Sequence, residues 1–215
     1  MPPPGTKASS RPVNIFNLPN AMPRQAELFV FMGLIASGKS TLAAAWARQI
    51  GARYFNSDRE RKTLAGLRPT APRAESFQAG IYSPEFTRRT YERLYLMAKT
   101  ELEAKRDVVL DGSYTAEQER RRLRDLTAAQ GAAIKFILCR CPDNIVRERL
   151  NIRAQDQEAV SDGRWEIYLR QKEYFSLPAE LENHELITLD TDAPVDTLLQ
   201  KLQKIEAAIN HRQGR

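Results

Sequence analysis

The chain is poor in the side chains that cross-link proteins or bind metals, because its 215 residues include two cysteines and two histidines. Cys139 and Cys141 fall together, and alternate residues of a strand share one face. One such pair is no disulfide framework, so we expect two thiols in a reducing compartment and not a metal or redox site. His184 and His211 have no partner pattern, and we expect both at the surface.

Long apolar runs are also missing. None approaches the roughly 18 residues of a membrane span, and the first residues lack the charged and apolar regions of a signal peptide. We therefore expect a cytoplasmic protein with no membrane partner. Hydrophobic residues at 42% and charged residues at 28% are ordinary for a globular domain, which excludes a fibrous or disordered chain.

Basic residues outnumber acidic ones, and the formal net charge is +6. The densest basic cluster reads Arg-Arg-Arg-Leu-Arg at residues 120–124. Glu117, Glu119 and Asp125 are interleaved with it, a pattern typical of a solvated helix face. The charge favours an anionic ligand, and a nucleic-acid partner is possible but not favoured.

One motif stands out against this background. Residues 33–40 read Gly-Leu-Ile-Ala-Ser-Gly-Lys-Ser, the G-x-x-x-x-G-K-S pattern of a phosphate loop, or P-loop. Residues 28–32 before it are apolar and strand-like, and residues 41–50 after it are rich in helix formers. Strand, loop and helix therefore follow in the order that this motif requires.

The glycines of the P-loop let successive backbone N–H groups converge on the phosphates of a nucleotide, and the helix N-terminus adds its positive dipole end. Lys39 would reach the β- and γ-phosphates, and the Ser40 hydroxyl would ligate Mg²⁺. No Asn-Lys-x-Asp run of the kind GTPases use for guanine is present, so ATP is favoured over GTP. The expected nucleotide contacts are Gly33, Leu34, Ile35, Ala36, Ser37, Gly38, Lys39, Ser40 and Thr41.

Strand-like and helix-like runs alternate along the chain. The expected strands are residues 28–32, 53–56, 107–110, 134–140 and 186–189. The expected helices are residues 40–50, 58–65, 84–104, 116–130, 143–154 and 195–209. This alternation predicts an α/β protein with the P-loop NTPase fold, a parallel five-stranded sheet with helices on both faces.

The remaining segments complete the predicted organisation. Residues 1–25 are rich in proline and predict a flexible N-terminal arm, which leaves residues 26–215 for one P-loop domain. Residues 67–83 and 153–164 fit neither strands nor helices, and such long irregular segments are often lids or binding loops. We expect a small helical lid at about residues 149–165.

Two acidic positions are candidates for chemistry. Asp58 and Arg61 lie three apart at a helix start, where a carboxylate could take a proton from a hydroxyl and a guanidinium could hold an anion. An N-cap aspartate followed by a solvated arginine is an equally good interpretation.

Asp111 ends an apolar strand, where such folds place ligand contacts, and it could organise Mg²⁺ through water. Gly112 follows it, without the glutamate that motor ATPases use to activate water.

Arginines follow in a predicted helix. Arg149 and Arg153 are four apart and share a face, so both could turn toward a bound nucleotide. An arginine beside the transferring phosphoryl group stabilises the charge on its equatorial oxygens. An exposed basic helix face is the alternative interpretation.

Taken together, these motifs resemble the small P-loop kinases grouped with the kinase domain of polynucleotide kinase, zeta toxins, gluconate kinase and chloramphenicol phosphotransferase. The predicted kinases of the AAA_33 type are most similar, over residues 26–192. The motifs that carry the resemblance lie at residues 33–41, 57–62, 80–85, 108–114 and 147–153. Residues 68–84 do not match the acceptor segment of any one characterised branch.

The resemblance implies roles for individual residues. It implies that Asp58 is the general base toward an acceptor hydroxyl and that Arg61 holds a phosphate of the acceptor. It implies further that Arg149 lies near adenine and Arg153 near the transferring phosphates. Asp111 and Ser113 complete the expected acceptor site, with Ser40 and Asp111 at Mg²⁺, and Lys39, Asp58 and Arg153 as the catalytic residues.

The expected function is transfer of the γ-phosphate of ATP, with Mg²⁺, to a hydroxyl of a small-molecule or nucleotide-like acceptor. A nucleotide-binding switch or slow ATPase without an acceptor is one alternative, and it would be indifferent to Asp58. A nucleic-acid 5′-hydroxyl kinase is another, and its oligonucleotide binding would weaken steeply with salt. We expect a monomer or weak dimer.

Overall fold

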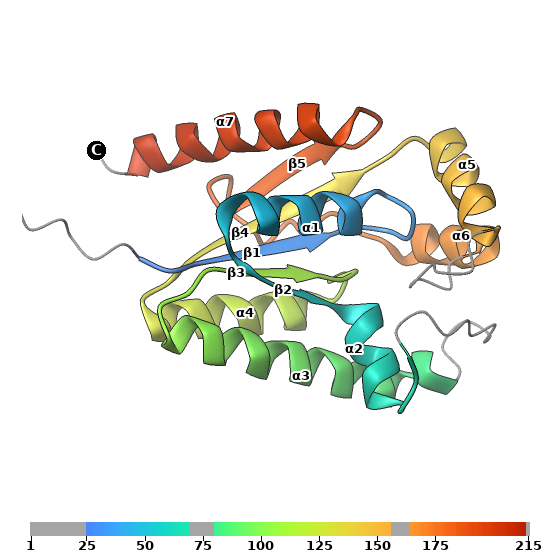
Figure 1. Cartoon of the computed structure of the whole chain (residues 1–215), viewed down its shortest axis with the longest axis horizontal. Coiled ribbons are helices and arrows are strands. Elements are labelled where there is room, and N and C mark those ends of the chain that lie inside the picture. The colour runs from blue at the N-terminus through green and yellow to red at the C-terminus, as the bar shows by residue number, and fades with distance from the viewer. Residues whose placement is uncertain (1–24, 69–79, 156–163, 214–215) are drawn as a thin grey trace, which may run out of the picture.

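The computed structural model describes residues 25–68, 80–155 and 164–213 (Figure 1). The strands are β1 (Glu27–Met32), β2 (Arg53–Asn56), β3 (Val108–Asp111), β4 (Ala133–Arg140) and β5 (Leu186–Asp190). The helices are α1 (Lys39–Ile50), α2 (Ser57–Leu64), α3 (Pro84–Glu103), α4 (Glu117–Gln130), α5 (Asp143–Ala154), α6 (Trp165–Tyr174) and α7 (Val195–Gln213), with a short 3-10 turn, η1 (Gly80–Tyr82).

The strands form one parallel sheet in the order β2-β3-β1-β4-β5. β1 lies at its centre, where Val30 pairs with Leu110 of β3 and Phe136 of β4, and all six of its residues are buried. Strands that are buried on both faces read as continuous apolar runs, as β1 and β3 do. The predicted α/β fold is confirmed, and each predicted strand agrees with the structure to within one residue.

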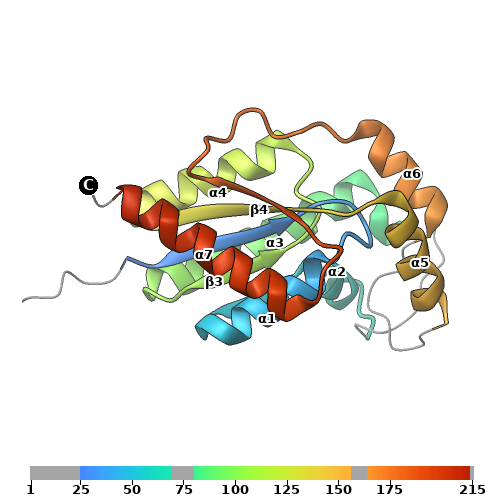
Figure 2. The same cartoon turned by 90° about the horizontal axis from the view of Figure 1, so that it is seen from above.

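Helices cover both faces of the sheet (Figure 2). Because side chains alternate along a strand, Leu28, Val30 and Met32 pack with α3 and α4, while Phe29 and Phe31 pack with α1 and α7. The parallel strands all end at the same edge, beside the N-terminal end of α1. The two hydrophobic clusters therefore fix the P-loop against the carboxyl ends of the strands.

The sequence did not predict α6, which follows the expected lid and lies beside α5 (Figures 1 and 2). Of its ten residues only Tyr168 is buried, so the helix has little apolar periodicity to reveal it. Most of the predicted arm (1–24), part of the expected acceptor segment (69–79) and part of the expected lid (156–163) lie outside the described residues. In the described ranges no helix combines the length and apolar character needed to cross a bilayer.

Candidate nucleotide and acceptor site

The P-loop joins β1 to α1 through backbone conformations that side chains disfavour. Gly33 has φ +138° and Gly38, the residue before α1, has φ +82°. Between them Ala36 also has a positive φ, +57°. These conformations turn the backbone around the N-terminal end of α1, where the helix dipole attracts anions.

Gly33 is required for a second reason, and this gives a stability prediction. A Cβ on Gly33 would lie 2.5 Å from the carbonyl oxygen of Cys139 in β4, so the backbone would have to shift. We expect Gly33→Ala to lower the free energy of unfolding by about 3 kcal/mol, from overpacking and the positive φ. Chemical denaturation of both proteins measures this difference.

Gly51→Ala is the matched control. Gly51 also has a positive φ, +69°, but a Cβ there would meet nothing within 4 Å. The control should therefore lose only about 1 kcal/mol, from backbone strain alone. Equal losses in the two variants would show that the close approach of the P-loop to β4 is unimportant.

A cavity of about 270 Å³ opens beside the P-loop. It brings together residues from five parts of the chain: the P-loop, the first turns of α1, the strand β2, the start of α2 and the end of α5. Among the described lining side chains three are cations and one is a carboxylate, so the cavity favours an anionic ligand. The lining residues are Ala36, Gly38, Lys39, Ser40, Thr41, Ala44, Tyr54, Asn56, Asp58, Arg59 and Arg153.

Three predicted catalytic residues thus share one cavity, although Lys39, Asp58 and Arg153 are far apart in the sequence. The Lys39 ammonium lies 3.4 Å from the carbonyl oxygen of Leu34, within the P-loop. Arg153 is half-buried near the end of α5. A carboxylate and two cations around one space can orient a hydroxyl and stabilise a transferring phosphoryl group.

Asp58 is not the N-cap of α2, which was one of its two interpretations. The cap is Asn56, whose side-chain oxygen accepts a hydrogen bond from the Arg59 N–H at 2.9 Å. Because Asn56 caps α2, the Asp58 carboxylate is not needed as the cap and is available to the cavity that it lines.

Asp111 lies at the carboxyl end of β3 and is completely buried. One carboxylate oxygen accepts hydrogen bonds from the Tyr54 hydroxyl at 2.8 Å and the Asn56 amide at 2.5 Å. Burial, and then the nearby Asp111 charge, raises the pKa of Tyr54, which keeps this hydroxyl a donor. The other oxygen, Oδ1, has no hydrogen-bond partner among the described residues.

The donor set fits Mg²⁺. A buried carboxylate oxygen without a partner is costly unless a cation or water satisfies it. Mg²⁺ keeps several waters and is commonly held by one or two carboxylates and the phosphates of a substrate. Asp111 and the half-buried Ser40 hydroxyl supply such a set, while the described residues contain no group of three or more His, Cys, Asp or Glu side chains that would hold a metal alone.

Arg149 contacts the P-loop but is not among the described residues that line this cavity. Its guanidinium donates to the carbonyl of Ala36 at 3.4 Å, the thiol of Cys141 at 3.3 Å and the carbonyl of Thr191 beyond β5. A Cβ on Gly38 would lie 3.0 Å from it. Arg149 thus links the P-loop to the segment after β5, and its contact with adenine stays a prediction.

Arg61 is not among the described residues that line the cavity. It is 6% exposed, donates to the carbonyl of Ile81 at 2.7 Å and to the Thr87 hydroxyl at 3.0 Å, and covers the ring of Tyr82. These contacts attach α2 to η1 and to the start of α3. The predicted contact of Arg61 with a phosphate of the acceptor is therefore not evident in this arrangement and stays a prediction.

Ser113 follows β3 in a loop that contacts the P-loop. Its carbonyl accepts a hydrogen bond from the Gly33 N–H at 3.3 Å, and its hydroxyl bonds to the Tyr91 hydroxyl of α3 at 2.9 Å. Tyr91 also accepts a bond from the N–H of Tyr114, whose φ is +43°. The loop is therefore held on both sides, close to the expected acceptor site.

The cysteines carry no part of this chemistry. Both are free thiols, and burial raises the pKa of Cys139 to about 12. Burial also raises the pKa of Cys141. Since the thiolate is the nucleophile and the metal ligand, neither residue is activated near neutral pH.

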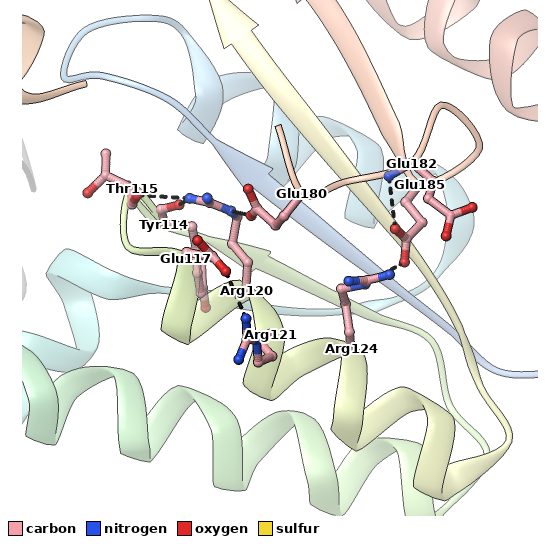
Figure 3. A network of polar contacts seen from close by, with 9 residues as sticks. All are labelled: Tyr114, Thr115, Glu117, Arg120, Arg121, Arg124, Glu180, Glu182 and Glu185. Atoms are coloured by element: carbon pink, nitrogen blue, oxygen red, sulfur yellow. Dashed lines mark hydrogen bonds and ion pairs between the residues drawn. The ribbon is translucent and has the colours of Figure 1, made fainter. Parts of the chain in front are cut away.

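Arg120 is a residue whose role the sequence did not reveal (Figure 3). It was expected on a solvated helix face, but it is 4% exposed, and that expectation is wrong. Its guanidinium donates to the carbonyls of Tyr114 and Thr115 at 2.7 and 2.9 Å and pairs with Glu180, lowering the pKa of that carboxyl. Arg120 thereby joins α4, the loop after β3 and the segment after α6.

The rest of the basic cluster is also paired with glutamates. Arg121 pairs with Glu117, Arg124 with Glu185, and Arg122 with glutamates of α3 and α4. The charge of this cluster is therefore compensated within the chain, which removes the main support for a nucleic-acid surface there.

The contrast between Arg120 and its neighbour gives a second stability prediction. Arg120→Met leaves Glu180 and two carbonyls without their donor, and we expect a loss of about 3 kcal/mol in the free energy of unfolding. Arg121→Met is the control, because its pair with Glu117 is exposed and worth less than about 0.5 kcal/mol. Denaturation curves that coincide for the two variants would contradict the prediction.

Comparison with known proteins identifies the family. The AAA_33 family model, described as an AAA domain, matches residues 28–178, which include the P-loop, Asp58, Asp111 and α6. The chain belongs to the AAA_33 family. The resemblance inferred from the sequence motifs is therefore confirmed.

Relatives of this AAA_33 domain include two mycobacterial proteins. "Uncharacterized protein Rv2004c" of Mycobacterium tuberculosis H37Rv and "Uncharacterized protein Mb2027c" of Mycobacterium bovis are each 28% identical to it over 118 residues. The match covers 55% of this chain and 24% of each relative. The AAA_33 domain thus spans about a quarter of the length of the curated relatives it matches.

Solved structures share the fold of this AAA_33 domain. A candidate kinase from Chloroflexus aurantiacus aligns with TM-score 0.64 and 19% identity, over 84% of this chain and 98% of that one. A gluconokinase from Sinorhizobium meliloti aligns with TM-score 0.60 and 16% identity, over 88% and 98%. The APS kinase CysC from M. tuberculosis, in complex with AMPPNP and APS, aligns with TM-score 0.59 and 18% identity, over 85% and 98%. The fold is that of P-loop kinases.

Proposed function

We propose that the chain is an ATP- and Mg²⁺-dependent phosphotransferase that acts on a hydroxyl of a small-molecule or nucleotide-like acceptor. The observation that carries the proposal is the cavity shared by Lys39, Asp58 and Arg153. A nucleotide switch needs the P-loop lysine, whereas a transferase also needs a base for the acceptor hydroxyl, the role proposed for Asp58. Structural neighbours that are named as kinases of small molecules support the same conclusion.

In the proposed reaction, Asp58 takes the proton of the acceptor hydroxyl as its oxygen attacks the γ-phosphorus. The bond from that phosphorus to the β,γ-bridging oxygen breaks, and ADP leaves. Lys39 and Arg153 stabilise the charge on the transferring oxygens, and the amides of the P-loop hold the other phosphates. Mg²⁺, held by Ser40 and through water by Asp111, would neutralise charge on the phosphates.

The acceptor site is proposed in outline. Ser113 and Arg61 would contact the acceptor beside Asp58, and Arg149 would contact the adenine. The pairing of the cluster at residues 120–124 with glutamates favours a small acceptor over a nucleic acid. A cytoplasmic location and a monomeric or weakly dimeric state stay predictions.

The test begins with calorimetric titration of Mg·ATP and continues with γ-labelled ATP and a panel of sugars, nucleosides, amino alcohols and 5′-hydroxyl oligonucleotides. We expect Mg·ATP to bind and one class of small molecule to accept the label and raise nucleotide turnover. An oligonucleotide acceptor, with binding that weakens steeply as salt rises, would replace the small-molecule assignment. Absence of heat with Mg·ATP would contradict the proposal as a whole.

A further inference from the structure

Gln171 of α6 contacts the P-loop directly. Its side-chain oxygen accepts a hydrogen bond from the backbone N–H of Ile35 at 2.9 Å, between residues 136 positions apart in the chain. Because the peptide N–H is a donor, the oxygen end of the Gln171 amide must face it. Gln171 is half-buried, on a helix that is otherwise mostly exposed.

Gln171 and Lys39 contact opposite ends of the same peptide group. The N–H of Ile35 and the carbonyl of Leu34 belong to a single planar peptide. That carbonyl lies 3.4 Å from the Lys39 ammonium and accepts its hydrogen bond. Gln171, the Leu34–Ile35 peptide and Lys39 therefore form a continuous chain of hydrogen bonds, in which each bond polarises the next.

The helix that carries Gln171 is itself attached to the site. The Tyr168 hydroxyl and the Lys172 ammonium both donate to the Asp143 carboxylate at the start of α5, at 2.7 Å. Tyr168 also packs with Ala36 of the P-loop in a small apolar cluster with Val146 and Leu150. These contacts do not pass through Gln171, so they should hold α6 in position when its side chain is changed.

We propose that Gln171 is a positioning residue for Lys39. It fixes the plane of the Leu34–Ile35 peptide and so the place of the ammonium that reaches the β- and γ-phosphates. The inference rests on the proposed function to the extent that a nucleotide must occupy the P-loop. The inference gives α6 a role in phosphate recognition, although α6 lies outside the P-loop motif.

The experiment compares Gln171→Met with the wild type and with Lys172→Met, using Mg·ATP and AMP as probes in competition binding. Methionine keeps the length of the side chain but cannot accept the Ile35 hydrogen bond. We expect Gln171→Met to bind Mg·ATP about fivefold to tenfold more weakly, the usual effect of losing one such bond. AMP affinity should not change, because AMP lacks the phosphates that Lys39 reaches.

Lys172→Met is the matched control, because it loosens the contact of α6 with α5 and leaves the P-loop bond intact. We expect it to keep the wild-type ratio of ATP to AMP affinity. We also expect the amide proton resonance of Ile35 to move upfield in Gln171→Met and to stay in Lys172→Met. Thermal unfolding of each variant measures any general loss of structure.

The outcomes separate this inference from the proposed function. Wild-type protein that fails to bind Mg·ATP contradicts the proposed function. If the wild type binds Mg·ATP and Gln171→Met has the same ratio of ATP affinity to AMP affinity as the wild type, only the role of Gln171 is overturned. A variant that loses ATP and AMP affinity equally, or a Lys172→Met control that behaves like Gln171→Met, also overturns it, since either result would mean that α6 acts through packing.

Discussion

Lys39→Met should abolish most of the nucleotide chemistry while leaving the fold intact. We expect phosphoryl transfer and any background hydrolysis to fall by about 10²- to 10³-fold, the usual effect of removing one preorganised donor from a transition-state oxygen. Methionine preserves the apolar stem, and within the described part of the chain the ammonium donates to one carbonyl, that of Leu34. The measurement is steady-state turnover of Mg·ATP with the identified acceptor.

The control for Lys39→Met is Lys105→Met, which removes the same charge from an exposed site whose contact is the carbonyl of Gln130. That variant should keep wild-type turnover, and both should unfold within a few degrees of the wild type. Full activity of the Lys39 variant would mean that the P-loop lysine does not contact the transferring group, and the catalytic assignment would fail.

Much of the fold was predictable because its signals are local. Apolar runs reveal the strands, since a strand of a covered parallel sheet is buried on both faces. The P-loop is likewise a contiguous motif, because one turn of backbone makes the phosphate site. From these elements the parallel topology follows, and with it the position of Asp58 and Asp111 at or just after the carboxyl ends of β2 and β3.

The parts that the sequence concealed depend on distant partners. Arg120 looks like its neighbour Arg121, but its carboxylate partner is Glu180, whereas Arg121 pairs with Glu117 one helical turn away. Local spacing reveals the second pair and not the first. Gln171 was missed for the same reason, because a lone polar residue on a polar helix gives no sign that it bonds to a peptide 136 positions earlier.

The choice between the two interpretations of Asp58 also depends on more than its local sequence. The sequence left open whether this residue caps a helix or meets a ligand, since both need a carboxylate near a helix start. The structure assigns the cap to Asn56 instead, a choice that depends on where β2 ends. Burial of the Arg61 guanidinium against η1 could not be foreseen either, because η1 follows a segment without helical or strand periodicity.

Asp58→Asn should separate nucleotide binding from phosphoryl transfer. The amide keeps the shape of the side chain but cannot take a proton, and loss of a general base typically costs about 10²- to 10⁴-fold in rate. We expect transfer to the identified acceptor to fall by that factor, while Mg·ATP binds with near wild-type affinity. Slow hydrolysis of ATP without acceptor should be unchanged, because the proton of the acceptor plays no part in it.

Glu60→Gln is the control for Asp58→Asn, because it removes one negative charge from the same helix at a side chain that pairs with Arg93. If transfer falls only in the Asp58 variant, the effect belongs to the carboxylate in the cavity and not to the charge of α2. If Asp58→Asn transfers phosphate as fast as the wild type, the acceptor proton leaves by another route. The assignment of Asp58 as the general base would then be wrong, although the protein would still be a phosphotransferase.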